Sequence, residues 1–308
     1  MANIPALVLK NARNRVPVVN AGLNFVEARF DQLKMNQGRI LIRLNRQLTS
    51  RKLQDYEFKV FSQWGEDGII QKLIDSVEIR EKTFIEFGVE HFSESNCRFL
   101  MMHDNWSGFV MDGSELNIEA CKRSHYYFKY ELEARQAFIT RDNINELLSH
   151  SGFGPDLGIL SIDLDGVDYW VAQAITGFTP RILIHEYNAL LGTRKITVPY
   201  DPAFERQKKH YSCLYWGASL GAVTHLANQR GYTLVGTNSA CCNAFFVRND
   251  LMTDKLEALT VEQAYSPSKY REAKDEQGRL TFASGDARLR ALAGLPVFNV
   301  ETGLEETL

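Results

Sequence analysis

Three aspartates close behind an apolar run are the part of the sequence that most suggests chemistry. In LGILSIDLDGVDYW, residues 157–170, the run leads into Asp163, Asp165 and Asp168, with Gly166 among them. Aspartate and glycine are common turn formers, so an ordinary surface turn is one explanation. The other is a strand that ends at a binding site, with Asp168 serving only as a favourable acid at the start of the next helix. If the strand persists to Asp165, alternation places Asp163 and Asp165 on the same face.

Acidic residues also lie at or next to the ends of the other expected strands. In an open α/β sheet, ligands bind beyond the carboxyl ends of the strands, so these side chains converge on one region. A buried carboxylate is costly unless it is paired, hydrogen-bonded or bound to a metal. The set therefore favours a binding site over a simple turn, and predicts a ligand rich in hydroxyls, amines or positive charge. Its members are Glu86, Asp112, Asp142, Asp163, Asp165 and Glu186.

The elements that must position these acids alternate between strands and helices. We expect strands at 83–89, 107–114, 130–140, 157–165 and 181–188, and helices at 62–77, 94–104, 115–124, 142–149 and 168–176. Such alternation is typical of crossover units in a mostly parallel sheet with helices on both faces. Two later strands, 231–236 and 243–248, are joined by only six residues and must pair antiparallel. The sequence thus predicts a doubly wound α/β fold with a seven-stranded sheet whose last strand is antiparallel.

The first 55 residues differ in charge from the rest of the chain. They contain ten Lys or Arg against three Asp or Glu, a balance of +7 in a chain of net charge −3. A heptad pattern runs through them, with Gln37 in register, and predicts a helix that packs on its own domain or forms a coiled coil between subunits. A helix lying on an anionic membrane surface is a less favoured alternative. The apolar members are Leu23, Val26, Phe30, Leu33, Ile40 and Leu44.

These patterns divide the chain into three parts. Residues 1–55 form a basic helical arm through which the protein is expected to make homo-oligomers. Residues 56–250 form the α/β domain, and residues 251–308 form a C-terminal extension with little patterning of its own.

Composition excludes several classes of protein. The 44% hydrophobic and 24% charged content is ordinary for a globular protein. A net charge of −3 argues against nucleic-acid binding by bulk electrostatics. No apolar run approaches the ~20 residues of a membrane span, and the start of the chain is a poor signal peptide. The five cysteines show no metal-site spacing, so we expect a cytoplasmic protein.

At this point the chain resembles a known family, the Rossmann-like S-adenosylmethionine-dependent methyltransferases, and within it the FkbM-type and related sugar O-methyltransferases. The resemblance covers roughly residues 58–250 and rests on the acid-x-Gly of FIEFGV, the acid ending GFVMDGS, the segments IDLDG and HEYN, and the final antiparallel hairpin. It implies methyl transfer from S-adenosylmethionine to a hydroxyl of a sugar, polysaccharide or related precursor, so a small molecule or a glycan is the expected substrate.

The resemblance also implies roles for residues at the strand ends. Glu86 and Gly88 would form the first cofactor loop, beneath the methionine part of the cofactor. Asp112 would accept hydrogen bonds from the two ribose hydroxyls, for which a carboxylate is the natural double acceptor. Asp142 or Asn143 would lie beside the adenine amino group.

One further residue and one departure concern the cofactor. Gln63, just before the first helix of the domain, is a candidate polar contact. The first loop, EFGVEHFSESN, has a single glycine, Gly88, where the family usually has two or three. Extra glycines let the backbone approach a ligand closely. Their absence keeps open an alternative, a non-catalytic binding protein on a methyltransferase-like fold.

Two mechanisms fit the acids after the fourth and fifth strands. Asp163, Asp165 and Glu186 offer the oxygen ligands that Mg²⁺ prefers. The resemblance implies the same possibility, because some related sugar O-methyltransferases hold magnesium with acids after strands four and five. The metal-free alternative uses Asp163 or His185 as the general base that takes the proton from the hydroxyl.

Overall fold

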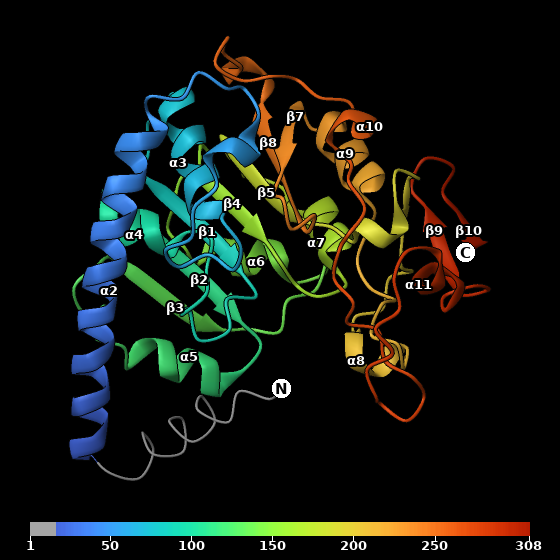
Figure 1. Cartoon of the computed structure of the whole chain (residues 1–308), viewed down its shortest axis with the longest axis horizontal. Coiled ribbons are helices and arrows are strands. Elements are labelled where there is room, and N and C mark those ends of the chain that lie inside the picture. The colour runs from blue at the N-terminus through green and yellow to red at the C-terminus, as the bar shows by residue number, and fades with distance from the viewer. Residues whose placement is uncertain (1–16) are drawn as a thin grey trace.

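The protein, seen in a computed structural model, is built around one seven-stranded sheet. The structure describes residues 17–308, so part of the expected arm, including residues 1–16, lies outside the described residues. The strand order is β3-β2-β1-β4-β5-β8-β7. The first five strands are parallel, whereas β8 is antiparallel to both of its neighbours. The predicted doubly wound sheet with an antiparallel last strand is therefore confirmed (Figure 1). The bounds are β1 Thr83–Phe87, β2 Ser107–Asp112, β3 Leu132–Gln136, β4 Ile159–Ile162, β5 Ile182–Glu186, β7 Tyr232–Thr237 and β8 Asn243–Arg248.

Side chains that alternate along the strands supply a separate core on each face of the sheet. Phe84 of β1 packs in the core beneath α3, α4 and α5, while the next residue, Ile85, packs in the core beneath α6, α7 and α9. Strands buried on both faces explain why their sequences are almost continuously apolar. The helix bounds are α3 Glu66–Ser76, α4 Arg98–Asp104, α5 Glu115–Lys122, α6 Ile144–Ser149, α7 Asp168–Ala174 and α9 Leu220–Gln229.

The C-terminal extension is part of the body. Its strands β9 (Pro296–Asn299) and β10 (Leu304–Thr307) join β6 (Ile196–Thr197) in a three-stranded antiparallel sheet. This small sheet lies on the side of the molecule opposite the N-terminal helix α2 (Figure 1). Val297 and Leu292 of the extension share a buried core with Ile196 and Leu214. The remaining short elements are η1 Leu53–Tyr56, η2 Ala189–Leu191, α8 Arg206–Lys209, η3 Asn249–Leu251, α10 Val261–Ala264 and α11 Asp286–Arg290.

Helix α2 (Pro17–Asn45) packs one face on the body, beside α3 and α4 (Figure 1). Met35 and Ile42 are buried there in a cluster with Phe99 of α4. Gly38 lies where the helix comes closest, because a Cβ at this position would be 2.7 Å from the Phe99 ring. The expectation that the arm is helical is confirmed for the described residues, and the packing of one face on its own domain is shown.

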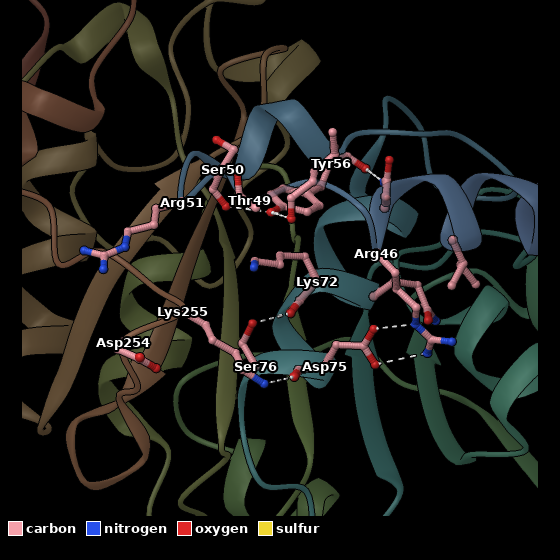
Figure 2. A pocket seen from close by; sticks show the side chains of 15 residues that line it. Arg46, Thr49, Ser50, Arg51, Tyr56, Lys72, Asp75, Ser76, Asp254 and Lys255 are labelled. Atoms are coloured by element: carbon pink, nitrogen blue, oxygen red, sulfur yellow. Dashed lines mark hydrogen bonds and ion pairs between the residues drawn. The ribbon is translucent and has the colours of Figure 1, made fainter.

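The carboxyl end of α2 is anchored at the rim of a surface hollow of about 680 Å³ (Figure 2). Arg46 makes two hydrogen bonds to the Asp75 carboxylate of α3, of 3.0 and 3.3 Å. Asn45 Nδ2 donates to the Tyr56 carbonyl oxygen at 2.6 Å. None of the acids at the carboxyl ends of the strands lines this hollow. Within residues 17–308, no helix has the length and apolar character needed to cross a membrane.

Gly38→Val should detach α2 from the body in part. The added side chain would overlap the Phe99 ring and the Val60 side chain, and overpacking of this kind typically costs about 1–3 kcal/mol in the free energy of unfolding. Gly22→Val is the matched control, since no atom of the described residues, apart from the backbone of the helix itself, lies within 4 Å of the Cβ position at Gly22. Urea titration of both variants measures the effect, and equal stabilities would show that the close contact at Gly38 contributes nothing.

Candidate active site

The first loop after β1 crosses the carboxyl end of β4 with no space between the two backbones. Gly88 has a φ of +69°, and a Cβ there would lie 1.7 Å from the Asp163 carbonyl oxygen. The Gly88 N–H donates to the Met111 carbonyl oxygen at 2.9 Å, which ties the loop to β2 as well. Only glycine fits both constraints. The single glycine of this loop therefore joins the ends of three strands.

Glu86 shapes the same loop from beneath. Its side chain is buried, and its carboxylate accepts hydrogen bonds from Ser95 Oγ at 2.6 Å and from the N–H groups of Asn96 and Cys97 at 2.7 and 3.2 Å. Burial raises the pKa of Glu86 to about 7, against the lowering effect of these donors. Glu86 therefore lies in β1, just before the predicted loop, and its oxygens hold the chain that leads into α4.

Asp112 connects the end of β2 to the first loop. Its Oδ2 accepts from the Glu90 N–H at 2.8 Å, and its Oδ1 accepts from the Ser114 N–H and from Asn117 Nδ2 at 2.8 and 3.1 Å. A carboxylate oxygen can accept two hydrogen bonds, so Oδ2 keeps one direction free of these protein donors. Asp112 thus holds the loop and still offers an acceptor to a hydroxyl.

Three other predicted cofactor contacts lie differently. Asn143 closes a local turn, accepting from the Thr140 N–H at 2.8 Å and donating to the Phe138 carbonyl oxygen at 2.9 Å. The Asp142 side chain is 74% exposed. Gln63 is exposed, and its carbonyl oxygen accepts from Lys59 at 2.8 Å. None of these three side chains is among the hydrogen-bond partners of Asp112 within the described residues.

The acids that the structure does bring together are Asp163, Asp168 and Glu186. One carboxylate oxygen from each lies within 4.8 Å of the others. Asp165 is instead 65% exposed and bonded to Arg206 at 3.0 Å. The expected grouping of Asp163 and Glu186 with Asp165 is therefore corrected to a grouping with Asp168, which is not merely an acid at the start of a helix.

The turn after β4 explains this exchange. The strand ends at Ile162, so strand alternation no longer aligns Asp163 with Asp165. Asp165 adopts a left-handed φ of 52°. The Asp168 carboxylate then accepts from the N–H groups of Leu164 and Gly166, at 2.5 and 2.9 Å, which folds the turn back. This turn positions Asp168 beside Asp163.

Burial and mutual repulsion dominate the electrostatics of this acid cluster (Asp163, Asp168 and Glu186). Loss of water raises the pKa of Asp163 and of Glu186 well above the ordinary range, and the neighbouring carboxylates raise both further. Burial raises the pKa of Asp168 to about 6. Glu186 Oε2 is buried and has no hydrogen-bond partner among the described residues. The cluster therefore needs protons or a cation, and its all-oxygen donor set fits a hard divalent cation.

His185 does not join this cluster. It directly precedes Glu186 in β5, so alternation places it on the opposite face, with Leu183 and Tyr187. The side chain is 1% exposed, and its Nδ1 lies 2.7 Å from the Glu186 carbonyl oxygen. Burial lowers the pKa of His185 to about 4, so the imidazole is neutral at pH 7.

Sequence patterns did not reveal Glu66, which is fully buried beside the same edge of the sheet. Its carboxylate accepts from Asn238 Nδ2 at 2.6 Å and from Asn243 Nδ2 at 3.1 Å, and Asn243 is paired with Glu186 in the sheet. Glu66 lies in the first turn of α3, where an acid also interacts favourably with the helix dipole. Its partners are more than 170 residues away, at separations of 172 and 177, and no local pattern could identify them.

The C-terminal extension also reaches this side of the domain. The Tyr270 ring packs against Trp64 with ring centroids 4.6 Å apart. Glu272 bonds Arg206 at 2.9 Å, and Arg206 is the residue that binds Asp165. A segment with little sequence pattern thus contacts the loop before α3 and the residues around the acid cluster.

Comparison with known proteins adds similarities of fold. No protein-family profile and no curated protein matches the chain. Among solved structures, the chain is similar to the N-terminal domain of EvdMO1 with SAH bound, at 11% identity and a TM-score of 0.41, over 61% of this chain and 82% of that one. It is also similar to a SAM dependent methyltransferase from Aquifex aeolicus, at 10% identity and a TM-score of 0.34, over 57% and 87% of the two chains. Similarities at this level assign no activity to the chain.

Asp168→Asn should change stability in a pH-dependent way. The pKa of Asp168 rises on folding from 3.8 to about 6, so its proton stabilises the folded state below pH ~4, and this contribution disappears as the pH rises through about 6. A shift of about two units corresponds to about 3 kcal/mol. Urea titrations at about pH 4 and about pH 7.5 give the free energy of unfolding of the wild type and of the variant. The wild-type value minus the variant value should be smaller at the higher pH. A difference that rises or stays constant would contradict the assignment.

Proposed function

We propose that the protein is an S-adenosylmethionine-dependent methyltransferase that transfers a methyl group to a hydroxyl of a sugar, polysaccharide or related small precursor. The observation that carries the proposal is the order of groups along the carboxyl edge of the sheet. A tight glycine loop lies between β1 and β4, a ribose-type acceptor, Asp112, lies at the end of β2, and a crowded acid cluster lies beyond β4 and β5.

The two halves of this edge suit two parts of one reaction. S-adenosylmethionine would supply an electrophilic methyl group and carries positive charge, which the carboxylates favour. Asp112 would orient the ribose through the unused acceptor direction of Oδ2. At the acid cluster, Asp163 would take the hydroxyl proton as the oxygen attacks, because burial and the neighbouring carboxylates raise its pKa and so make it a stronger base than an exposed carboxylate.

A magnesium ion is compatible with the same residues. Asp163, Asp168 and Glu186 would hold it, and it would lower the pKa of a bound substrate hydroxyl. The buried, unpartnered Glu186 Oε2 is the observation in favour of such an ion. The metal-free alternative leaves protons shared among the three acids and Asp163 as the base.

The composition of the first loop favours one rival, a binding protein without turnover. Where extra glycines would be expected, Glu90 and Phe92 adopt left-handed φ angles of 47° and 61°, and the Phe92 ring is fully buried. Such a loop is rigidly shaped by its own side chains. Failure of both S-adenosylmethionine and S-adenosylhomocysteine to bind would favour this rival.

Calorimetric titration tests the cofactor. Both S-adenosylmethionine and S-adenosylhomocysteine should bind, and Asp112→Asn should weaken each by roughly tenfold or more, because an amide replaces a charged double acceptor. Asp250→Asn is the control, since its exposed carboxylate follows the antiparallel β8 and lies at the opposite edge of the sheet. If neither compound binds the wild type at about 1 mM, the cofactor assignment fails.

Substitutions in the acid cluster test the chemistry. Asp163→Asn should keep the fold and reduce turnover by about 10²–10⁴-fold, the usual effect of losing a proton acceptor. If magnesium is bound, Asp168→Asn and Glu186→Gln should reduce both turnover and the response of turnover to added Mg²⁺. EDTA should then abolish turnover by the wild type, and Asp165→Asn should reduce turnover only slightly. Without a metal, EDTA should have no effect. Wild-type turnover by Asp163→Asn would refute both mechanisms.

A further inference from the structure

Helix α2 has a second apolar row that residues 17–308 leave exposed. We call this row the outer seam. Its apolar side chains are between 48% and 65% exposed, although all are large. The members are Val26, Phe30, Leu33, Gln37, Ile40 and Leu44, at alternating four- and three-residue steps. One large exposed apolar residue is ordinary, but five in one continuous register mark an interaction surface.

The face that packs on the body is a separate row with the same spacing. Asp31, Met35, Gly38 and Ile42 are buried, and Asp31 is paired with Arg98 and with His125 at 2.8 Å. At about 100° per residue, the centres of the two rows are about 150° apart around the helix. The outer seam therefore points away from the domain, and a partner helix could lie along it without meeting the body.

We propose that the outer seam binds the same seam of a second copy of this chain, as a two-stranded parallel coiled coil. The spacing is that of a and d positions in a heptad, with Phe30, Gln37 and Leu44 at a and Val26, Leu33 and Ile40 at d. Each copy would keep its own body on the far side of its helix. The proposal does not depend on the catalytic function.

Gln37 determines both the partner and the orientation. In a parallel pair, a positions face a positions, so the Gln37 amides of the two copies hydrogen bond each other and set the register. In an antiparallel pair, Gln37 would face a d residue, and every d residue here is apolar, which leaves a buried amide unpaired. A membrane surface would likewise bury this amide in the middle of the apolar row without a partner.

The charges beside the outer seam distinguish binding to a second copy of the chain from binding to a membrane. A parallel pair places Arg29 of one copy beside Lys34 of the other, and these like charges repel. Added salt screens the repulsion, so self-association should strengthen as salt rises. Binding to anionic lipid would use the same cations as attractive groups and should weaken with salt. The sign of the salt effect therefore separates a second copy from a membrane.

Analytical ultracentrifugation of the full chain, at about 0.05 M and about 0.5 M salt, tests the proposal. We expect a dimer whose dissociation constant falls at the higher salt concentration. The double variant Leu33→Lys/Ile40→Lys should weaken association by roughly a hundredfold or more. Both side chains are about 60% exposed in the single chain, at 65% and 59%, so circular dichroism and thermal unfolding should remain as in the wild type. Gln32→Lys, on the same helix but outside the outer seam, is the matched control for added charge.

Three results would overturn the proposal. The first is a wild type that stays monomeric at both salt concentrations. The second is a Leu33→Lys/Ile40→Lys variant that dimerises with the same dissociation constant as the wild type and as Gln32→Lys. The third is flotation of the monomer with vesicles of anionic phospholipid at low salt, lost at high salt and lost in the double variant. A dimer that survives Gln37→Leu but becomes a mixture of assemblies would support the role of Gln37 in setting the register.

Discussion

The crowding of three carboxylates at one edge of the sheet is the constraint to which the rest of the structure responds. Oxygens of Asp163, Asp168 and Glu186 lie within 4.8 Å of one another, and burial opposes the charge on each. Such a group persists only if the surrounding backbone holds it, because repulsion would otherwise separate its members. The turn after β4 does so by directing two N–H groups at Asp168. The antiparallel β8 supports Glu186 from the other side. The backbone thus holds the three carboxylates close enough to bind a cation or to share a proton.

The opposite half of the edge is organised by acids that serve as scaffolds. Glu86 and Asp112 direct their oxygens mainly at the backbone of the first loop and of the chain around it. The first loop has a single glycine, so its backbone is less flexible than a loop with several glycines. The hydrogen bonds to Glu86 and Asp112 fix its shape instead. Gly88 remains indispensable because the Asp163 carbonyl oxygen occupies the space of a Cβ. The first loop and the turn that carries Asp163 are therefore in direct contact, so a change at Gly88 would also move the backbone of the acid cluster.

The segments outside the sheet bind to this body in different ways. The C-terminal extension contributes a buried core and a small sheet, and reaches Trp64 and Arg206 near the acids. Helix α2 packs one row of side chains on the body, and the buried ion pair between Asp31 and Arg98 belongs to that contact. A second row of α2 is exposed on the opposite side. The two rows have the same alternating three- and four-residue spacing, and their centres are about 150° apart around the helix. One row can therefore pack on the body while the other faces away from it.

The sequence by itself determined the elements and their order. Alternating runs, continuous apolar strands and a six-residue link predicted the parallel sheet and its antiparallel last strand, because periodicity and loop length are local properties. It also located acids at the strand ends. Only the tertiary structure decided which acids meet. Asp168 replaces Asp165 because a left-handed residue turns the chain after Ile162, and His185 lies on the opposite face from Glu186. Glu66 reaches Asn238 across 172 residues. Periodicity assigns a residue to a face of its own element, whereas turn geometry and packing decide what that residue touches.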